Sequence, residues 1–207
     1  MKEIELTDPK EIALIQRVYE VFLVEGMKRV TMDHMSKILN VSKKTLYKYV
    51  KNRKELVMKS TIFQVERDTA KIIEIQNKEL NPIHEQHELT LFFMETLSKI
   101  NPIVHYDLEN YFPEAWKYLT DFFGGFCYRS ICENLERGQK EGVYRKDFNP
   151  AVVGRLYSSK IDVIFDGELF PSTDFNFKDV YSEYVLYHLN AIVSEDGKKI
   201  LTELDFK

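Results

Sequence analysis

Apolar side chains recur three and four positions apart along most of the chain, and no segment shows the strict alternation typical of a half-buried strand. This pattern predicts an all-α fold. Pro, Gly, Asn and Ser interrupt the pattern where helices should begin or end. The expected helices cover residues 9–25, 32–39, a short segment after Ser42, 52–80, 84–100, 114–140, 150–165 and 177–193.

Two short helical patterns near the N-terminus flank a tight turn. Met35, Ile38 and Leu39 lie on one face of the first helix. The turn at residues 40–42 contains Asn, which tolerates turn geometry, and ends with Ser42, a favourable N-cap for the second helix. The sequence therefore predicts a helix-turn-helix motif, with the helix over 9–25 bracing it into a three-helix domain.

The second helix of this motif begins with two lysines. Lys43 and Lys44 lie in its first turn, where the helix dipole disfavours cations by roughly 0.3–1 kcal/mol each. Between Lys37 and Lys59 the sequence has eight basic residues against one acid, Glu55. Such an excess favours a polyanion as partner, and the helix start with its lysines predicts a phosphate-binding surface. The alternative is a solvated basic face.

A set of residues in this region forms a specific motif. Its core is V-S-x-x-T-L-Y-x-Y over residues 41–49, followed by a basic residue and a leucine. The members of the set are Gly26, Thr31, Val41, Ser42, Thr45, Leu46, Tyr47, Tyr49 and residues 53–56. This set resembles the N-terminal signature of the TetR/AcrR-type one-component transcriptional regulators, and the similarity covers roughly residues 10–58 of the chain.

The resemblance implies a helix-turn-helix DNA-binding domain over residues 1–52 and a helical ligand-binding and dimerisation domain over 53–207. It implies that Thr31 and Arg53 hold phosphates and that residues 43–45 read base edges. Tyr47 and Tyr49 would meet the DNA backbone, and charge alone adds Lys48. The implied DNA contacts are therefore Thr31, Lys43, Lys44, Thr45, Tyr47, Lys48, Tyr49 and Arg53.

The rest of the chain is expected to provide dimerisation and control. A twofold dimer doubles the contacts of one motif and reads a palindrome, so a homodimer is expected on physical grounds. The resemblance implies that the last two long helices, about 150–165 and 177–193, form its interface. It also implies a repressor that is released from its operator by a small molecule.

Aromatic residues concentrate in the middle of the chain. Residues 111–128 include eight aromatic side chains around Gly124 and Gly125. Two glycines inside a helix indicate close packing, a bend, or space left for a ligand. One interpretation is a pocket for an apolar or aromatic molecule, lined by Phe93, Tyr111, Trp116, Phe122 and Phe126. The other is a tightly packed aromatic core.

Composition and charge support this division of the chain. The chain has 207 residues, 44% of them hydrophobic, so it can bury a substantial core. Residues 1–60 carry 13 Lys and Arg against 8 Asp and Glu, whereas the remainder carries 16 against 25. Only the first part is therefore expected to approach nucleic acid.

Other functions receive little support from the sequence. The first residues mix both charges without an apolar segment, and no apolar stretch has the length of a membrane span, so a cytoplasmic, nucleoid-associated protein is expected. Cys127 and Cys132 are expected to be buried free thiols. His84 and His87 are three apart rather than the four of a zinc-protease motif, which makes a metal-dependent hydrolase a weak alternative. We expect no cofactor and no enzymatic activity; a DNA-bound architectural protein without a ligand is a further alternative.

Overall fold

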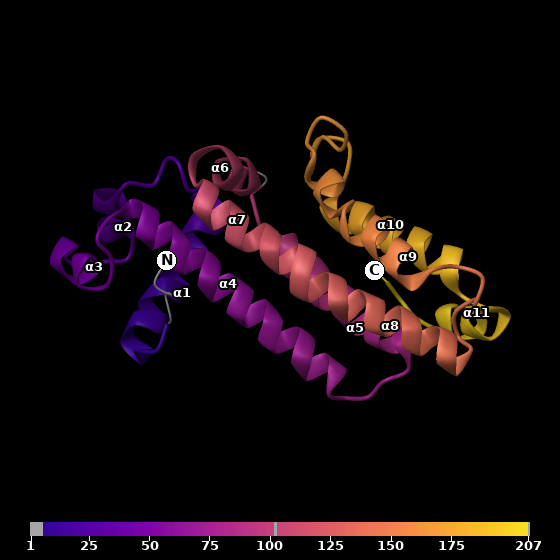
Figure 1. Cartoon of the computed structure of the whole chain (residues 1–207). Coiled ribbons are helices and arrows are strands. Elements are labelled where there is room, and N and C mark those ends of the chain that lie inside the picture. Colours follow the sequence, from indigo (N-terminus) through magenta and orange to yellow (C-terminus); the bar gives the residue numbers. More distant parts are fainter. Residues whose placement is uncertain (1–5, 102, 207) are drawn as a thin grey trace. The chain divides into compact units, whose positions relative to one another are not determined.

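The computed structural model describes residues 6–101 and 103–206, without the side chains of residues 161 and 162. Every regular element in these ranges is a helix, which confirms the all-α fold, and an isolated antiparallel bridge joins Tyr144 to Val193. The elements in chain order (Figure 1) are α1 (Pro9–Glu25), α2 (Met32–Ile38), α3 (Lys43–Tyr49), α4 (Arg53–Gln76), α5 (Pro82–Leu97), α6 (Ile103–Tyr111), α7 (Pro113–Phe122), the π-helix η1 (Phe123–Cys127), α8 (Tyr128–Glu141), α9 (Pro150–Ser158), the 3-10 helix η2 (Ile161–Phe165), α10 (Phe177–Ile192) and α11 (Glu195–Leu201).

The chain divides into two compact units. The N-terminal unit comprises Met1–Thr69 and Lys99–Asp121, and the C-terminal unit comprises Ala70–Ser98 and Phe122–Lys207. The first unit thus holds α1 to α3, most of α4, α6 and nearly all of α7. The predicted division into a DNA-binding and a ligand-binding domain after residue 52 stays a prediction. The compact units divide elsewhere, because packing extends the N-terminal unit along α4 to Thr69.

The first three helices of the N-terminal unit begin where the sequence predicts. Side-chain oxygens of Asp8, Thr31 and Ser42 accept hydrogen bonds from the backbone N–H groups of Lys10 (2.8 Å), His34 (3.1 Å) and Thr45 (3.0 Å). Each bond satisfies a helix N–H that has no partner inside the helix. The core of the unit is formed by buried apolar residues of these helices, among them Ile15, Val18, Phe22, Met35 and Leu46.

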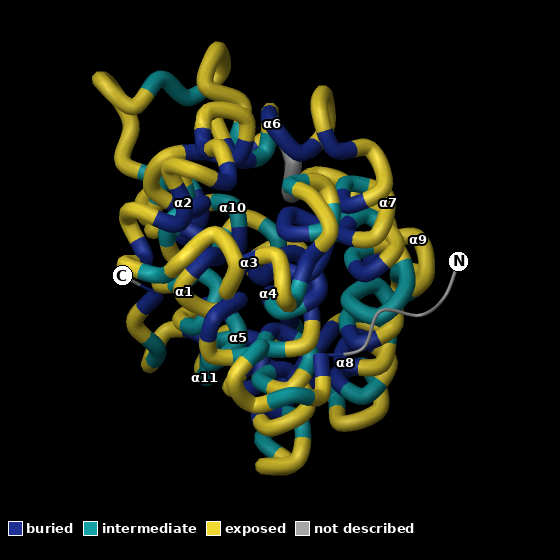
Figure 2. The backbone as a smooth tube through the Cα atoms, turned by 90° about the vertical axis from the view of Figure 1, so that its left-hand side faces the viewer, coloured by how far each residue is buried: buried dark blue, intermediate teal, exposed yellow. Residues whose placement is uncertain are grey.

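The C-terminal unit is built mainly from α5, α8, α9 and α10. Gly138 of α8 lies against the buried ring of Tyr144, and a Cβ atom at this position would come within 2.0 Å of the ring. A larger residue at 138 would therefore displace Tyr144. Buried positions recur along these helices between exposed ones (Figure 2). Within the described ranges, none of the helices combines the length and apolar character that crossing a bilayer would need.

The predicted helix over 150–165 is wrong in its second half. α9 ends at Ser158, and a short 3-10 helix follows at Ile161–Phe165. The hydroxyls of Ser158 and Ser159 donate to the carbonyl oxygens of Arg155 (3.3 Å) and Leu156 (3.4 Å). Such local side-chain bonds compete with regular helix hydrogen bonds, which explains why the helix stops at two serines.

Other boundaries also differ from the predicted ones. The helix expected over 114–140 is interrupted by one π-turn at Phe123–Cys127, which contains both glycines. A Cβ at Gly124 would meet nothing within 4 Å, so close packing does not explain this glycine. α4 ends at Gln76, four residues before the predicted end, and α6 and α11 are helices that the apolar pattern did not predict.

Candidate nucleic-acid interface and ligand cavity

The helix-turn-helix motif is formed by α2, the turn at residues 39–42 and α3. Asn40 has a φ of 50°, a left-handed conformation that Asn tolerates, and the Val41 N–H donates to the Ser36 carbonyl oxygen at 3.0 Å. Leu46 is fully buried and anchors α3 to the unit. The remaining side chains of α3 are exposed or half-buried (Figure 2). The motif therefore presents one polar, basic helix face to solvent.

The predicted DNA-contact residues lie on or beside this face. Tyr49 and Arg53 are half-buried, and the other six are exposed, namely Thr31, Lys43, Lys44, Thr45, Tyr47 and Lys48. The Ser42 and Thr45 hydroxyls are 2.8 Å apart at the start of α3. The Lys48 ammonium lies 4.8 Å from the centroid of the Tyr49 ring. Their contacts with DNA stay predictions.

Some of the basic residues have partners inside the protein. The Lys43 ammonium is 2.6 Å from the Asp33 carboxylate, and the buried Lys59 ammonium is 2.5 Å from Glu11 and donates to the Tyr49 carbonyl oxygen at 2.6 Å. Asp33 and Glu11 precede the segment in which the excess was counted. Two of the eight cations between Lys37 and Lys59 therefore have a counter-charge from outside this segment. Lys37, Lys44, Lys51 and Lys54 form no ion pair within the described part of the chain.

Arg53, predicted to hold a phosphate, contacts two other parts of the N-terminal unit. Its guanidinium donates to the Lys28 carbonyl oxygen at 2.9 Å and lies 5.4 Å from the centroid of the Phe112 ring. The side chain is thereby fixed beside the loop that follows α1. A contact between Arg53 and a phosphate would use the guanidinium N–H groups that remain.

Asp107 of α6 binds the same loop and was not identified from the sequence. Its buried carboxylate accepts hydrogen bonds from the backbone N–H groups of Met27 (2.8 Å) and Lys28 (2.7 Å). Gly26 has a φ of 81°, and a Cβ there would lie 3.0 Å from the Asp107 carboxylate, so this position requires glycine. The sequence signal is an acid on the same helix face as the buried Val104 and Leu108.

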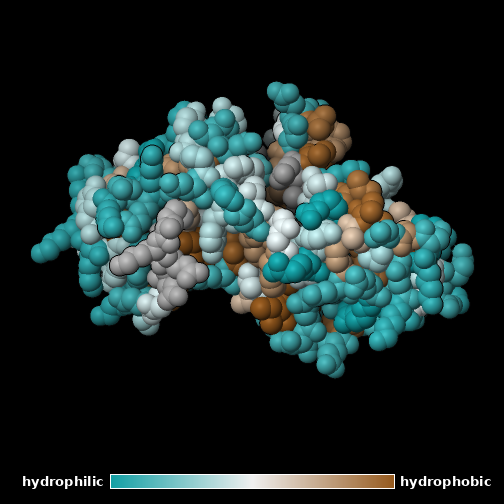
Figure 3. Space-filling view, in the orientation of Figure 1, coloured by the Kyte–Doolittle hydropathy of each residue, from teal (hydrophilic) through white to brown (hydrophobic). Residues whose placement is uncertain are grey.

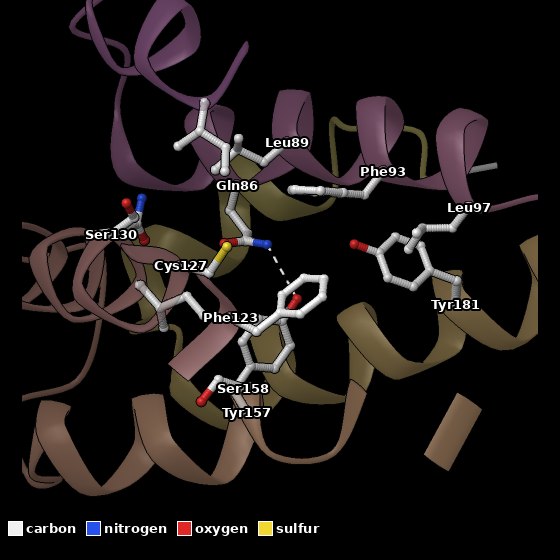
Figure 4. Close-up of a pocket in the computed structure, with 13 residues that line it drawn as sticks. Gln86, Leu89, Phe93, Leu97, Phe123, Cys127, Ser130, Tyr157, Ser158 and Tyr181 are labelled. Atoms are coloured by element: carbon white, nitrogen blue, oxygen red, sulfur yellow. Dashed lines mark hydrogen bonds between the residues drawn. The ribbon is translucent and has the colours of Figure 1, made fainter. Parts of the chain in front are cut away.

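A cavity lies within the C-terminal unit (Figure 4). About 90 Å³ of it is open to the centre of a water molecule, whereas a single water needs about 10–15 Å³ on this measure. Its apolar lining comes from Ile72, Leu89, Phe93, Leu97, Phe123 and Ile131. The other lining residues are Gln86, Cys127, Ser130, Asn134, Tyr157, Ser158 and Tyr181. The cavity is large enough for a small organic molecule.

The five predicted pocket residues are not brought together. Phe93 lines the cavity. Phe122 and Phe126 belong to the same unit and stack on each other with centroids 5.8 Å apart, but neither lines the cavity. Tyr111 and Trp116 lie in the N-terminal unit, where Tyr111 accepts a 2.6 Å hydrogen bond from Lys28 and Trp116 packs edge-on against His105.

Buried polar groups next to the cavity form a connected network. The Asn134 amide donates to the Pro82 carbonyl oxygen (3.0 Å) and to Glu85 (2.8 Å), and it accepts from the Tyr144 hydroxyl (3.1 Å). Glu85 also pairs with Arg137 at 2.6 Å. Burial raises the pKa of the Tyr144 hydroxyl well above its ordinary value, so this tyrosine stays a neutral donor.

Tyr157 borders both the cavity and a groove on the outer side of α9 and α10. The groove is also lined by Leu156, Tyr184, Tyr187 and His188. The Tyr157 ring stacks on His188 with centroids 4.0 Å apart, and its hydroxyl accepts from Gln86 at 3.3 Å. Burial lowers the pKa of His188 to about 4, so the imidazole is neutral near pH 7.

The groove belongs to a partly apolar surface. Hydrophobic side chains gather over the region of α9, α10 and the segment that joins them, whereas the surface around α3 is mostly hydrophilic (Figure 3). Tyr187 is 78% exposed, and the other exposed apolar residues here include Val152, Leu156, Val163, Leu169 and Phe175. Exposed apolar residues in this number are typical of an interaction surface.

The histidines considered for a metal-dependent hydrolase are placed differently. His84 is exposed, and His87 hydrogen-bonds the Asp205 carbonyl oxygen at 2.5 Å and packs edge-on against Phe206. Across the part of the chain that the structure describes, no three His, Cys, Asp or Glu side chains gather as metal ligands do. Cys127 and Cys132 are not joined in a disulfide and are half-buried rather than fully buried.

Comparison with known proteins relates the chain to solved structures. The sequence itself matches neither a protein-family model nor a curated protein. A TetR-family transcriptional regulator from Agrobacterium tumefaciens is similar with a TM-score of 0.73 and 11% identity, over 90% of this chain and all (100%) of that one. The fatty acid degradation regulator FadR from Bacillus halodurans has a TM-score of 0.70 and 15% identity over 89% and 97% of the two chains. The ketosteroid transcriptional regulator KstR2 of Mycobacterium tuberculosis has a TM-score of 0.61 and 16% identity over 92% and 98%. At these identities the comparison establishes a shared fold.

Proposed function

We propose that this chain, which has the fold of the TetR-type transcriptional regulators, is a ligand-responsive regulator that binds duplex DNA and is not an enzyme. One observation carries the proposal: a single chain combines an N-capped, exposed basic helix in one compact unit with a ligand-sized cavity in the other. The first feature suits a polyanion and the second suits a small organic molecule.

DNA recognition is assigned to α3 and the residues around it. Lys44 and Thr45 are exposed on the first turn of α3, where they can reach base edges in the major groove. Thr31 and Arg53, at the starts of α2 and α4, would contact phosphates. Lys43 has a counter-charge in Asp33, so its contribution to DNA affinity should be smaller than that of Lys44.

A homodimer would provide two such helices for a palindromic operator. We assign its interface to α9 and α10, because these helices expose Val152, Leu156 and Tyr187 beside an open groove. Burying these side chains against a second copy would remove apolar surface from water. This keeps the predicted interface over residues 150–165 and 177–193, with α9 shortened to Pro150–Ser158.

Regulation follows from thermodynamic linkage between DNA binding and the binding of a small molecule. A small molecule that lowers DNA affinity must bind the DNA-incompetent form of the protein more tightly, and DNA lowers its affinity by the same factor. We place this molecule in the cavity lined by Phe93, Phe123 and Tyr181 and infer that its binding releases the operator, which makes the protein a repressor.

The test is a gel-shift titration with DNA from upstream of the protein's own gene, carried out over a salt series. Binding should depend on sequence and weaken steeply with salt, because each phosphate contact releases counterions. The matched variants are Lys44→Ala, which should weaken binding, and Lys78→Ala, an exposed lysine of the C-terminal unit that should not. Binding that ignores both salt and sequence would contradict the proposal.

An architectural DNA-binding protein without a ligand is the alternative that the test must separate. It would show the same salt dependence, but no small molecule would both stabilise the protein and weaken DNA binding. A thermal-shift screen followed by gel shifts with each stabilising compound distinguishes the two.

A further inference from the structure

The cavity is lined without any charged side chain. Its 13 lining residues include no Lys, Arg, His, Asp or Glu. Glu85, which precedes the lining residue Gln86, is buried and already paired with Arg137 and Asn134. A charged ligand would lose its hydration here without gaining a counter-charge, so an uncharged molecule is favoured.

Most polar atoms around the cavity are already used within the protein. Asn134 donates both amide hydrogens and accepts from the Tyr144 hydroxyl, so little of its hydrogen-bonding capacity remains for a ligand. The Ser158 hydroxyl donates back to the Arg155 carbonyl oxygen at 3.3 Å. These groups shape the wall, but they leave ligand recognition to others.

The Tyr181 hydroxyl is not used in this way. Tyr181 is only 4% exposed, and its hydroxyl has no hydrogen-bond partner among the described residues. Its hydroxyl points into the cavity (Figure 4). Burial raises the pKa of this hydroxyl well above its ordinary value, so it stays protonated and can donate. A ligand oxygen in the cavity would therefore gain a hydrogen bond from Tyr181 without displacing a protein partner.

Gln86 provides a second polar group at the cavity. Its amide nitrogen makes one long hydrogen bond, 3.3 Å to the Tyr157 hydroxyl, and its side-chain carbonyl oxygen has no partner in the part of the chain that the structure describes. Phe93, Phe123 and Tyr157 add flat apolar walls around the same space. The site thus combines ring surfaces with one donor and one acceptor.

We infer that the cavity binds an uncharged, ring-containing molecule whose hydroxyl or carbonyl oxygen accepts a hydrogen bond from Tyr181. This inference rests on the proposed function and specifies the chemical class of its ligand. A ligand hydroxyl could also donate to Gln86, whereas a carboxylate or an ammonium group would be rejected.

Three probes with one ring system test the inference by isothermal titration calorimetry on the full chain: naphthalene, 2-naphthol and 2-naphthoate. 2-Naphthol should bind about threefold to tenfold more tightly than naphthalene, because it gains one hydrogen bond. 2-Naphthoate should bind at least about a hundredfold more weakly than 2-naphthol, because its charge has no partner. Equal or tighter binding of 2-naphthoate, or no binding of any probe, would overturn the inference.

The variant Tyr181→Phe removes the hydroxyl and keeps the ring. It should abolish the preference for 2-naphthol over naphthalene, whereas Tyr106→Phe, which changes an exposed tyrosine of the N-terminal unit, should keep it. If the preference survives in Tyr181→Phe, the assignment to Tyr181 is wrong.

A second measurement needs no ligand. Tyr181→Phe removes a hydroxyl that faces the cavity without a protein partner and should leave the melting temperature of the unliganded protein nearly unchanged. Tyr144→Phe removes a paired one and should lower it. A lower melting temperature for Tyr181→Phe would contradict the inference that the Tyr181 hydroxyl has no protein partner in the unliganded protein.

The ligand class and the proposed function can fail separately. Gel shifts with the unliganded protein test DNA binding alone. If 2-naphthol binds as expected but leaves DNA binding unchanged, the ligand class stands and regulation through the cavity fails. If DNA binding is specific but no probe binds, the inference fails and DNA recognition stands.

Discussion

Buried polar groups are used differently in the two units. In the N-terminal unit, the Asp107 carboxylate accepts hydrogen bonds from two backbone N–H groups of the loop after α1. The Lys59 ammonium is held by Glu11 and the Tyr49 carbonyl oxygen. Among the described residues, only Ser60 has a fully enclosed hydroxyl without a partner. In the C-terminal unit, the Tyr181 hydroxyl faces a cavity and has no such partner. The first arrangement fixes a basic helix in position; the second keeps hydrogen-bonding capacity for a small molecule.

The largest effect is expected from breaking the loop contact in the N-terminal unit. Asp107→Ala removes two hydrogen bonds to a buried carboxylate, each worth about 1.5–3 kcal/mol, so the free energy of unfolding should fall by about 4 kcal/mol. Urea denaturation of the wild type and the variant measures this loss in the free energy of unfolding. Asp107→Asn keeps an oxygen that can accept both bonds but removes its charge, so it should lose about half as much. A loss below about 1 kcal/mol for the alanine variant would show that the loop does not depend on Asp107.

Two lysines of the same segment should respond in opposite ways. Lys59→Met leaves the half-buried Glu11 carboxylate without its partner and should cost about 3 kcal/mol of stability, with an unchanged salt slope of DNA binding. Lys44→Met is exposed and should leave the stability nearly unchanged, but it should lower the salt slope by about one. Denaturation and gel shifts across a salt series measure the two quantities. Exchanged results would mean that Lys59, and not Lys44, meets the DNA.

The C-terminal unit should lose stability in mild acid through His188. Burial lowers the pKa of folded His188 to about 4 from 6.5, so between these values the unfolded chain binds a proton that the folded chain does not. Stability therefore falls as pH falls below about 6.5, by about 2 kcal/mol at pH 5, and this residue has no effect at higher pH. Urea denaturation of the wild type and of His188→Gln between pH 4.5 and 7.5 measures the difference. Parallel curves would show that His188 is not the titrating group.

The local features of the N-terminal unit could be predicted from the sequence because they depend on neighbouring residues. Thr31 and Ser42 cap the helices that they precede, and Leu46 points inward while Lys44 and Tyr47 point out, as helical spacing requires. Asp107 was missed although it shares a helix face with Val104 and Leu108. A local pattern does not show which distant backbone groups a buried carboxylate will bind.

The cavity could not be predicted in the same way. Its lining residues come from α4, α5, η1, α8, α9 and α10, so their meeting depends on tertiary packing. Counting aromatic residues selected Tyr111 and Trp116, which belong to the other unit, because composition does not show which way a ring points. Tyr157 and Tyr181 were not predicted, and neither was Phe123, although it lies in the aromatic-rich segment. Of the five predicted residues, only Phe93 lines the cavity.

Tyr157 has a consequence for how affinities should be measured. The Tyr157 ring borders both the cavity and the groove on α9 and α10. A ligand in the cavity and a protein bound in the groove would therefore both contact Tyr157. If a second subunit covers the groove, ligand binding in the cavity and dimerisation through the groove become thermodynamically coupled. Each then changes the equilibrium constant of the other by the same factor. The apparent dissociation constant of the small molecule should then drift with protein concentration, and a dilution series would reveal the coupling without any mutation.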